Sequence, residues 1–178
     1  IDEYSYRLTE QIAKEIEDIE LPRATNVKFN SDTTLEDLCR RNAKNRNIDL
    51  SNKVYEDRLV REINMIKEKD FEDYFFVISD MVRGAKKTML VGPARGSSAG
   101  SLVCFLLDIT DVDPIKHDLM FERFIDVNRL DLPDIDIDFP DTRRDEVIAD
   151  LQEKYGEDNV ARIGTVSRLK PKSALTEV

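Results

Sequence analysis

Apolar residues recur every three to four positions through most of the first 90 residues, a spacing typical of amphipathic helices. The pattern predicts a helix over residues 1–19, a second that begins after Asp32 or Thr33, a third from about Asn52 and a fourth over residues 71–87. Their apolar stripes are Ile12, Ile16 and Ile19; Leu35, Leu38 and Cys39; Tyr55, Leu59, Ile63 and Ile66; and Phe71, Tyr74, Phe75, Ile78 and Val82. We expect the stripe of the fourth helix to lie in the core rather than to form a base-stacking platform, and we expect the Glu and Lys residues of the third helix to form a solvated face.

Beyond residue 88 the pattern predicts short strands that alternate with helices. We expect strands over residues 89–91, 133–139 and 160–163, and helices over residues 102–107 and 119–124. A further helix should begin at a cap formed by Asp141 or Thr142 and end at Gly156, and another should begin at residue 170. The predicted fold class is therefore α/β, a small mixed sheet covered by helices.

Residues 133–139 (PDIDIDF) alternate strictly between acidic and apolar side chains, and we call them the acidic segment. In a strand, successive side chains point to opposite faces, so Asp134, Asp136 and Asp138 would share one face about 6.6 Å apart. The apolar residues would face a core. Three carboxylates at this spacing repel one another unless a cation lies between them, and hard divalent cations prefer oxygen ligands. The segment therefore predicts a metal site.

Two other interpretations of the acidic segment are a solvated surface and a calcium-binding loop. The spacing of the aspartates fits the first, third and fifth positions of an EF-hand. However, that motif requires Gly at its sixth position, where this chain has Phe139, and Glu at its twelfth, where it has Asp145. A solvated surface does not explain the isoleucines at alternate positions, because Asp is depleted from ordinary strands.

Residues 92–101 (GPARGSSAGS) form what we call the glycine–serine turn, between a predicted strand and a predicted helix. Backbone N–H groups of such a turn and the N-terminus of the following helix can bind phosphate, and small residues allow close approach. Ser97 or Ser98 can add a hydroxyl, and Arg95 a fork of donors. The turn lacks the Lys-Ser or Lys-Thr of a Walker A motif. The alternative is a plain glycine-rich turn with a capping serine.

Composition narrows the classes of protein that remain. The chain has 178 residues, of which 40% are hydrophobic, and a net charge of −10 that argues against holding DNA by bulk electrostatics. The single histidine, His117, excludes a histidine-based metal cage, and Cys39 and Cys104 suggest free thiols in a reducing cytoplasm. The sequence contains no apolar run long enough for a membrane span and no signal peptide. Because it begins at Ile1, we expect a fragment of a longer protein.

The order of these motifs resembles that of family C bacterial replicative DNA polymerases, the family of the DNA polymerase III alpha subunit. The resemblance rests on residues 91–103 (VGPARGSSAGSLV), 109–114 (ITDVDP), 121–124 (FERF) and 133–139, and continues through residues 143–148 (RRDEVI) and 154–156 (KYG). Residues 71–75 (FEDYF) also match. The resemblance to the family covers most of residues 55–178, whereas residues 1–50 match more loosely.

The resemblance implies a palm domain of the polymerase-β-like nucleotidyltransferase type over residues 51–178, truncated at the start of the thumb. Residues 1–50 would be a helical linker after a missing phosphoesterase-type domain. Asp136 and Asp138 would be the catalytic metal ligands for two Mg²⁺ ions, for which Mn²⁺ can substitute. Gly96 and Ser97, with neighbouring Arg95 and Ser98, would bind the nucleotide. Lys172 matches a lysine near the family's active site and would contact nucleotide or primer.

The implied activity is DNA-directed DNA synthesis, with dNTPs, primer–template DNA, a sliding clamp and other replisome subunits as partners. The sequence departs from the family at Ala94, where Gly is usual, and lacks the family's third catalytic aspartate. We therefore expect this chain alone to be inactive. Two alternatives remain: a template-independent nucleotidyltransferase, in which the acidic strand would follow the turn sooner, and a non-catalytic palm-like interaction module.

Overall fold

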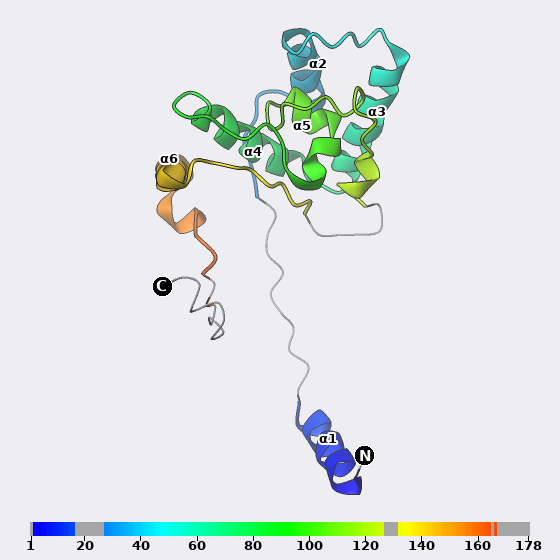
Figure 1. The fold of residues 1–178 in the computed structure, drawn as a ribbon, viewed down its shortest axis with the longest axis vertical. Helices are drawn as coiled ribbons and strands as arrows, with labels where there is room; N and C mark the ends of the chain where they lie inside the picture. Colours follow the sequence, from blue (N-terminus) through cyan, green and yellow to red (C-terminus); the bar gives the residue numbers. More distant parts are fainter. Residues whose placement is uncertain (1, 17–26, 127–131, 165, 167–178) are drawn as a thin grey trace, which may run out of the picture.

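The computed structural model describes residues 2–16, 27–126, 132–164 and 166 (Figure 1). Its α-helices are α1 (Glu3–Glu15), α2 (Leu35–Asn45), α3 (Lys53–Glu68), α4 (Glu72–Ala85), α5 (Leu102–Leu106) and α6 (Arg144–Tyr155). Four short 3₁₀-helices complete the elements of the described residues: η1 (Gly96–Gly100), η2 (Phe121–Arg123), η3 (Asp141–Arg143) and η4 (Glu157–Asn159).

The predicted α/β fold with a small mixed sheet is wrong, because the described residues form helices and no strand. Residues 89–91, 133–139 and 160–163 lie outside any helix or strand. A sheet needs a ladder of backbone hydrogen bonds, and the acidic segment makes a single such bond to residues 89–92, from Gly92 N–H to the Asp138 carbonyl (2.9 Å). Pro93, which follows at once, has no N–H with which to continue a ladder.

The predicted helices of the first half are confirmed, with small shifts at their ends. Thr34 caps α2 through its hydroxyl, which accepts from Asp37 N–H at 3.1 Å, so the cap lies one residue beyond the predicted Thr33. α3 starts close to the predicted residue, and Asn52 is its cap, with a side chain that accepts from Val54 N–H at 3.0 Å. α4 ends at Ala85, just short of the predicted end. These local signals are sufficient because a cap and an apolar stripe act within one helix.

The core is built around α5, a helix of five residues that are all buried (Figure 1). α5 packs against α2 and α3, and residues of α4 join the same cluster. Phe75 of α4 meets Phe124 edge to face at 6.1 Å between ring centroids, and Phe124 meets Phe121 in the same way at 6.2 Å. The aromatic residues of the fourth predicted helix are thus core residues, as expected.

The acidic segment runs from this core to a second, smaller cluster around Val147 of α6 and Met89. Ile135 packs against the main core and Phe139 against the smaller one, while the Tyr74 hydroxyl donates to the Pro133 carbonyl at 2.9 Å. The three aspartates are exposed and the apolar residues between them are half-buried. The predicted two-faced segment is therefore confirmed without a sheet, since alternation reports exposure rather than strand pairing.

The remaining elements differ from the predictions in detail. Residues 119–124 contain only the 3₁₀ turn η2, and α6 has no side-chain cap from Asp141 or Thr142, because these residues form η3 instead. Gly156 ends α6 as predicted, with φ of +94°. α1 has no buried residue. None of the helices among the described residues is long and apolar enough to cross a membrane.

Candidate functional site

The glycine–serine turn is tightly wound and held by its own hydrogen bonds. Gly96 has a φ of +62°, in the left-handed region that only glycine adopts readily. The Ser98 hydroxyl is buried and donates to the Arg95 carbonyl at 2.9 Å. Ser97 is partly exposed, and Arg95 is exposed. Arg95, Gly96 and Ser97 therefore present the accessible part of the turn, whereas the Ser98 hydroxyl organises it from inside.

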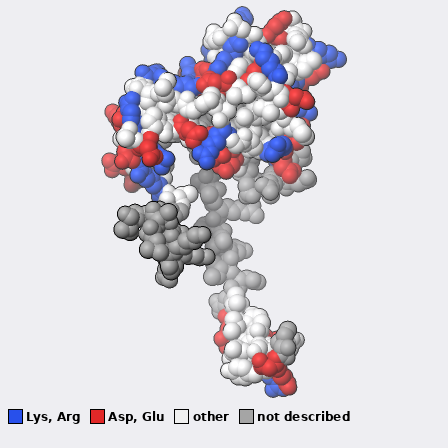
Figure 2. Space-filling model, viewed as in Figure 1, with Lys and Arg blue, Asp and Glu red and all other residues white. Residues whose placement is uncertain are grey.

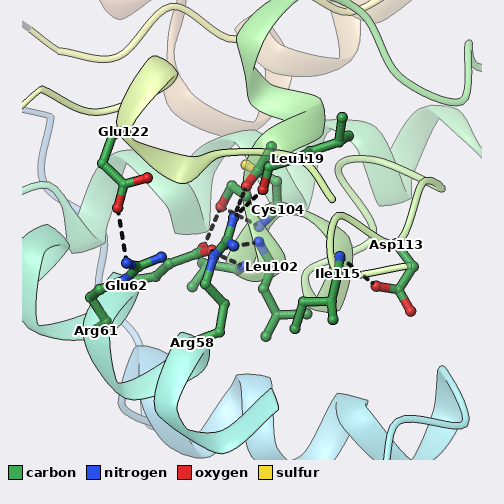
Figure 3. A network of polar contacts seen from close by, with 12 residues as sticks. Arg58, Arg61, Glu62, Leu102, Cys104, Asp113, Ile115, Leu119 and Glu122 are labelled. Carbon is green, nitrogen blue, oxygen red and sulfur yellow. Dashed lines mark hydrogen bonds and ion pairs between the residues drawn. The ribbon is translucent and has the colours of Figure 1, made fainter. Parts of the chain in front are cut away.

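The N-terminus of α5, which the sequence suggested as a phosphate site, is occupied by a side chain of the protein. Glu62 of α3 is fully buried, and its carboxylate accepts from Leu102 N–H at 2.9 Å and Val103 N–H at 3.0 Å (Figure 3). It also accepts from the Ser101 hydroxyl at 2.8 Å. An anionic ligand cannot use donors that are already paired with a carboxylate, so that expectation is corrected.

Arg58 compensates the buried charge of Glu62. Its Nε donates to Glu62 Oε1 at 2.6 Å, and its Nη2 donates to the carbonyls of Gly100 at 2.6 Å and Leu119 at 2.9 Å (Figure 3). Burial raises the pKa of Glu62, while the N–H groups of Val103 and Leu102 and the charge of Arg58 oppose that rise. The network thus connects α3 to both the end of the glycine–serine turn and the segment before η2.

The acidic segment lies directly against the turn. A Cβ atom placed on Gly92 would lie 2.8 Å from the Cβ of Asp138, and one placed on Gly96 would overlap the carboxylate of Asp136. Both distances are shorter than real side chains allow. At Gly92 the obstacle is the Cβ of Asp138, so the close approach requires glycine. At Gly96 the obstacle is the end of the exposed Asp136 side chain, which can turn away, so the positive φ is the stronger requirement for glycine. The structure therefore brings together Asp136, Asp138 and the turn, which lie about 40 residues apart in the chain.

Arg95 links the two parts electrostatically. Its Nη1 donates to Asp138 Oδ1 at 2.8 Å, in a pair whose side chains are 63% and 53% exposed. The hydrogen bond and charge of Asp138, and then the charge of Asp136, raise the pKa of the Arg95 guanidinium above its ordinary value. Because the pair is exposed to solvent, it contributes little net stability and can exchange partners readily.

The chemistry of these residues suits a metal ion, but the described residues do not supply a complete set of ligands. Asp136 and Asp138 offer exposed carboxylate oxygens, which suit a hard divalent cation such as Mg²⁺. The described residues contain no group of three His, Cys, Asp or Glu side chains that could hold a metal ion. Two carboxylates suit a shared site that another part of a longer protein completes. Lys172, the remaining predicted site residue, lies outside the described residues.

Sequence reasoning missed Glu62 and Arg58, because it assigned the charged residues of α3 to a solvated face. The signal was present in the spacing. Glu62 lies three residues after Leu59 and four before Ile66, and so falls on the buried stripe of α3. An acid on an apolar stripe with Arg four residues earlier is typical of a buried ion pair.

Comparison with known proteins identifies the family. The family described as "Bacterial DNA polymerase III alpha NTPase domain" matches residues 33–178. This chain belongs to the DNA polymerase III alpha family. The family membership predicted from the motifs is thereby confirmed, and the glycine–serine turn and acidic segment both lie within the matched residues.

Relatives in this family are similar over most of the chain. The DNA polymerase III subunit alpha of Mycoplasma genitalium is 47% identical over 167 residues, which cover 90% of this chain and 19% of the relative. The DNA polymerase III subunit alpha of Bacillus subtilis is 49% identical over 149 residues, which cover 83% of this chain and 13% of the relative. The chain therefore spans less than a fifth of the length of these relatives.

Proposed function

We propose that this chain forms part of the nucleotidyl-transfer site of a DNA-directed DNA polymerase, which adds deoxynucleotides to a primer 3′-hydroxyl. The observation that carries the proposal is the contact between the acidic segment and the glycine–serine turn, where Asp138 lies against Gly92 and Asp136 lies against Gly96. Carboxylates beside a donor-rich turn suit a reaction in which metal ions and phosphates must lie together.

The turn would position the triphosphate of the incoming nucleotide. Gly96 carries no side chain, so a phosphate can approach the backbone closely, and the partly exposed Ser97 can donate its hydroxyl. Arg95 can donate two hydrogen bonds to phosphate oxygens. The turn itself is held from inside by the Ser98 hydroxyl. This part of the mechanism is positioning together with electrostatic stabilisation.

Asp136 and Asp138 would hold the metal ions together with a third carboxylate from a part of the subunit beyond this chain. Bound there, two Mg²⁺ ions would activate the primer hydroxyl and neutralise charge on the triphosphate and the leaving pyrophosphate. The two aspartates would thus serve to fix the metal ions beside the turn. Their exposure is consistent with this role, because both side chains are open to solvent and to ligand.

Arg95 would exchange partners when nucleotide binds. Without ligand it neutralises Asp138 at 2.8 Å. With nucleotide and metal present, Asp138 would turn to the cation and Arg95 to the phosphate. Exposed ion pairs of this kind are weak, so the exchange opposes binding only slightly.

The DNA itself would be held largely outside this chain. On the face drawn in Figure 2, Lys and Arg side chains are interspersed with Asp and Glu, and the net charge is −10. A surface of this composition does not attract a polyanion strongly. Primer–template contacts, the sliding clamp and other replisome subunits would therefore involve the rest of the subunit, and this chain alone would not polymerise.

The test is templated incorporation by the full-length subunit that contains this chain. Asp136→Asn and Asp138→Asn should each lower kcat by about a hundredfold or more, because each removes charge that would stabilise the transition state. Asp134→Asn is the matched control, since it lies on the same exposed face but contacts neither glycine of the turn. Equal activity of all three variants would refute the proposal, and incorporation without template would favour the template-independent alternative.

Metal binding can be measured without the reaction. In the full-length subunit, Mn²⁺ should raise the melting temperature, because a ligand that binds only the native state stabilises it. Asp136→Asn and Asp138→Asn should reduce that rise, while Asp134→Asn should keep it. In chelator, Asp136→Asn should melt no lower than the parent, because it removes repulsion between like charges. An unchanged Mn²⁺ response in both variants would show that the aspartates do not bind the metal.

A further inference from the structure

We infer that Glu62 and Arg58 are positioning residues that set the conformation of the glycine–serine turn and thereby its affinity for nucleotide. This inference rests on the proposed function of the turn. It concerns two side chains of α3 that contact the turn only at its end, at Gly100 and Ser101. They would act through the turn and would not touch the nucleotide.

The buried charge of Glu62 carries a large desolvation cost. Glu62 is fully buried, and the Arg58 side chain is 13% exposed. Removing a carboxylate from water is strongly unfavourable, and buried ion pairs are often no more stabilising than apolar residues of similar size. Stability alone therefore does not account for this pair, whereas the fixed geometry of its hydrogen bonds does. Glu62 accepts four hydrogen bonds and Arg58 donates three, from directions that define one arrangement.

α5 already has an ordinary cap, because the Ser101 hydroxyl accepts from Cys104 N–H at 3.1 Å. That cap leaves the buried N–H groups of Leu102 and Val103 without a partner within the helix, and Glu62 accepts from both. Neither role requires a contact between Glu62 and Ser101. The hydrogen bond from the Ser101 hydroxyl to Glu62 therefore adds a link from α3 to Ser101, the last residue of the turn.

A continuous series of hydrogen bonds connects Glu62 to the accessible part of the turn. Ser101 donates its hydroxyl to Glu62 and its N–H to the Ser98 carbonyl at 3.1 Å. Ser98 in turn donates its hydroxyl to the Arg95 carbonyl at 2.9 Å. Three consecutive hydrogen bonds thus join the buried carboxylate to the residue that also contacts Asp138. A change in the position of Glu62 would therefore shift both Arg95 in the turn and its contact with Asp138 in the acidic segment.

Arg58 fixes the same turn from the other direction. It donates to the carbonyls of Gly100, at the end of the turn, and Leu119, in the segment before η2. These two segments lie very close together, because a Cβ placed on Gly100 would lie 2.6 Å from the Met120 carbonyl oxygen. One guanidinium thus holds the end of the turn against the segment before η2. The turn has no freedom to slide along that segment while both bonds are in place.

The experiment uses the full-length subunit that contains this chain and compares three variants. Glu62→Gln keeps the size of the side chain but removes its charge and half of its acceptors. Ser101→Ala removes the first link to the turn, together with the cap on Cys104 N–H, and leaves Glu62 paired with Arg58 and two N–H groups. Ile66→Val is the matched control, because Ile66 is fully buried one turn further along α3 and is apolar.

The first readout is steady-state kinetics. Ser101→Ala should raise the KM for nucleotide about three- to tenfold, the range expected for loss of its hydrogen bond to Glu62, and Glu62→Gln should raise it more. The KM for primer–template DNA should stay at the parent value, and kcat should fall less than the nucleotide KM rises. Ile66→Val should leave the nucleotide KM unchanged even where it lowers the melting temperature.

The second readout is hydrogen exchange of the backbone amides, which does not depend on the reaction. Exchange should speed up in residues 92–101 of Ser101→Ala and Glu62→Gln and stay unchanged in α6. If Glu62→Gln does not fold, Ser101→Ala decides alone. Parent-like nucleotide KM and parent-like exchange in residues 92–101 would overturn the inference. A nucleotide KM in Ile66→Val that rises as much as in Ser101→Ala would also overturn it, because general destabilisation would then explain the effect.

Failure of the inference is distinguishable from failure of the proposed function. The proposed function fails if Asp136→Asn and Ser97→Ala leave incorporation unchanged, whatever the network variants do. The positioning inference fails if those two variants lose activity while Ser101→Ala and Glu62→Gln match the parent in both readouts.

Discussion

Replacement of Gly96 by alanine should damage the turn in two separable ways. Gly96 has a φ of +62°, and an L-residue in that conformation costs about 1–2 kcal/mol relative to glycine. In addition, the new Cβ would overlap the Asp136 carboxylate, so that carboxylate must turn away from the turn. At about 2–4 °C per kcal/mol for a chain of this length, the conformational cost alone lowers the melting temperature by about 2–8 °C.

Two other substitutions separate these effects. Gly96→Asn tolerates the left-handed conformation better than alanine but carries the same Cβ, so it should recover part of the melting temperature and none of the nucleotide affinity. Gly84→Ala is the matched control, because a Cβ there meets nothing within 4 Å and the residue lies inside α4. That variant should gain about 1 kcal/mol of stability from helix propensity and keep its activity.

The assays are thermal unfolding of the 178-residue chain and nucleotide KM in the full-length subunit. Gly96→Ala should melt below the parent and Gly84→Ala above it, and only the Gly96 variants should raise the nucleotide KM. The reasoning is refuted if Gly96→Ala melts at the parent temperature with an unchanged nucleotide KM. A loss of affinity in Gly96→Ala that Gly96→Asn fully restores would show that the contact with Asp136 is unimportant.

Three further predictions concern side chains around the site. Burial tends to raise the pKa of Asp80, but hydrogen bonds from its two partners on α6 outweigh this and lower it. The pairing therefore stabilises the fold above the ordinary Asp pKa of about 3.9, and this stability is lost as pH falls through the lowered pKa. Asp80→Asn should lower the melting temperature at pH 7, and its difference from the parent should shrink as pH falls below about 3.9. Burial, and then a hydrogen bond to Asp113, raises the pKa of Tyr55 to about 12. Tyr55→Phe should lower the free energy of unfolding in urea by about 1–2 kcal/mol. An unchanged free energy of unfolding would show that water replaces the bond. Arg95→Ala should leave the melting temperature nearly unchanged because its pair with Asp138 is exposed, yet raise the nucleotide KM about ten- to a hundredfold; a parent-like KM would remove Arg95 from the site.

The sequence by itself determined the local features of this protein. The starts of α2 and α3, the stop of α6 at Gly156 and the buried stripes of α3 and α4 all follow from caps and from spacing within one helix. The two faces of the acidic segment were also predictable, because alternation along one chain decides which side chains can share a core. The motifs around residues 92–101 and 133–139 were sufficient to predict the family.

Only the tertiary structure decided what these elements contact. Extended segments become a sheet only when a neighbour supplies a ladder of hydrogen bonds, and the acidic segment meets residues 89–92 through one bond before Pro93 intervenes. The sequence predicted that the N-terminus of α5 could bind phosphate. In the structure, the carboxylate of Glu62, 40 residues earlier in the chain, accepts the hydrogen bond of its Leu102 N–H. The partners of Glu62 and Asp138 are set by packing between distant segments, and periodicity within a segment carries no information about the groups that another segment brings to it.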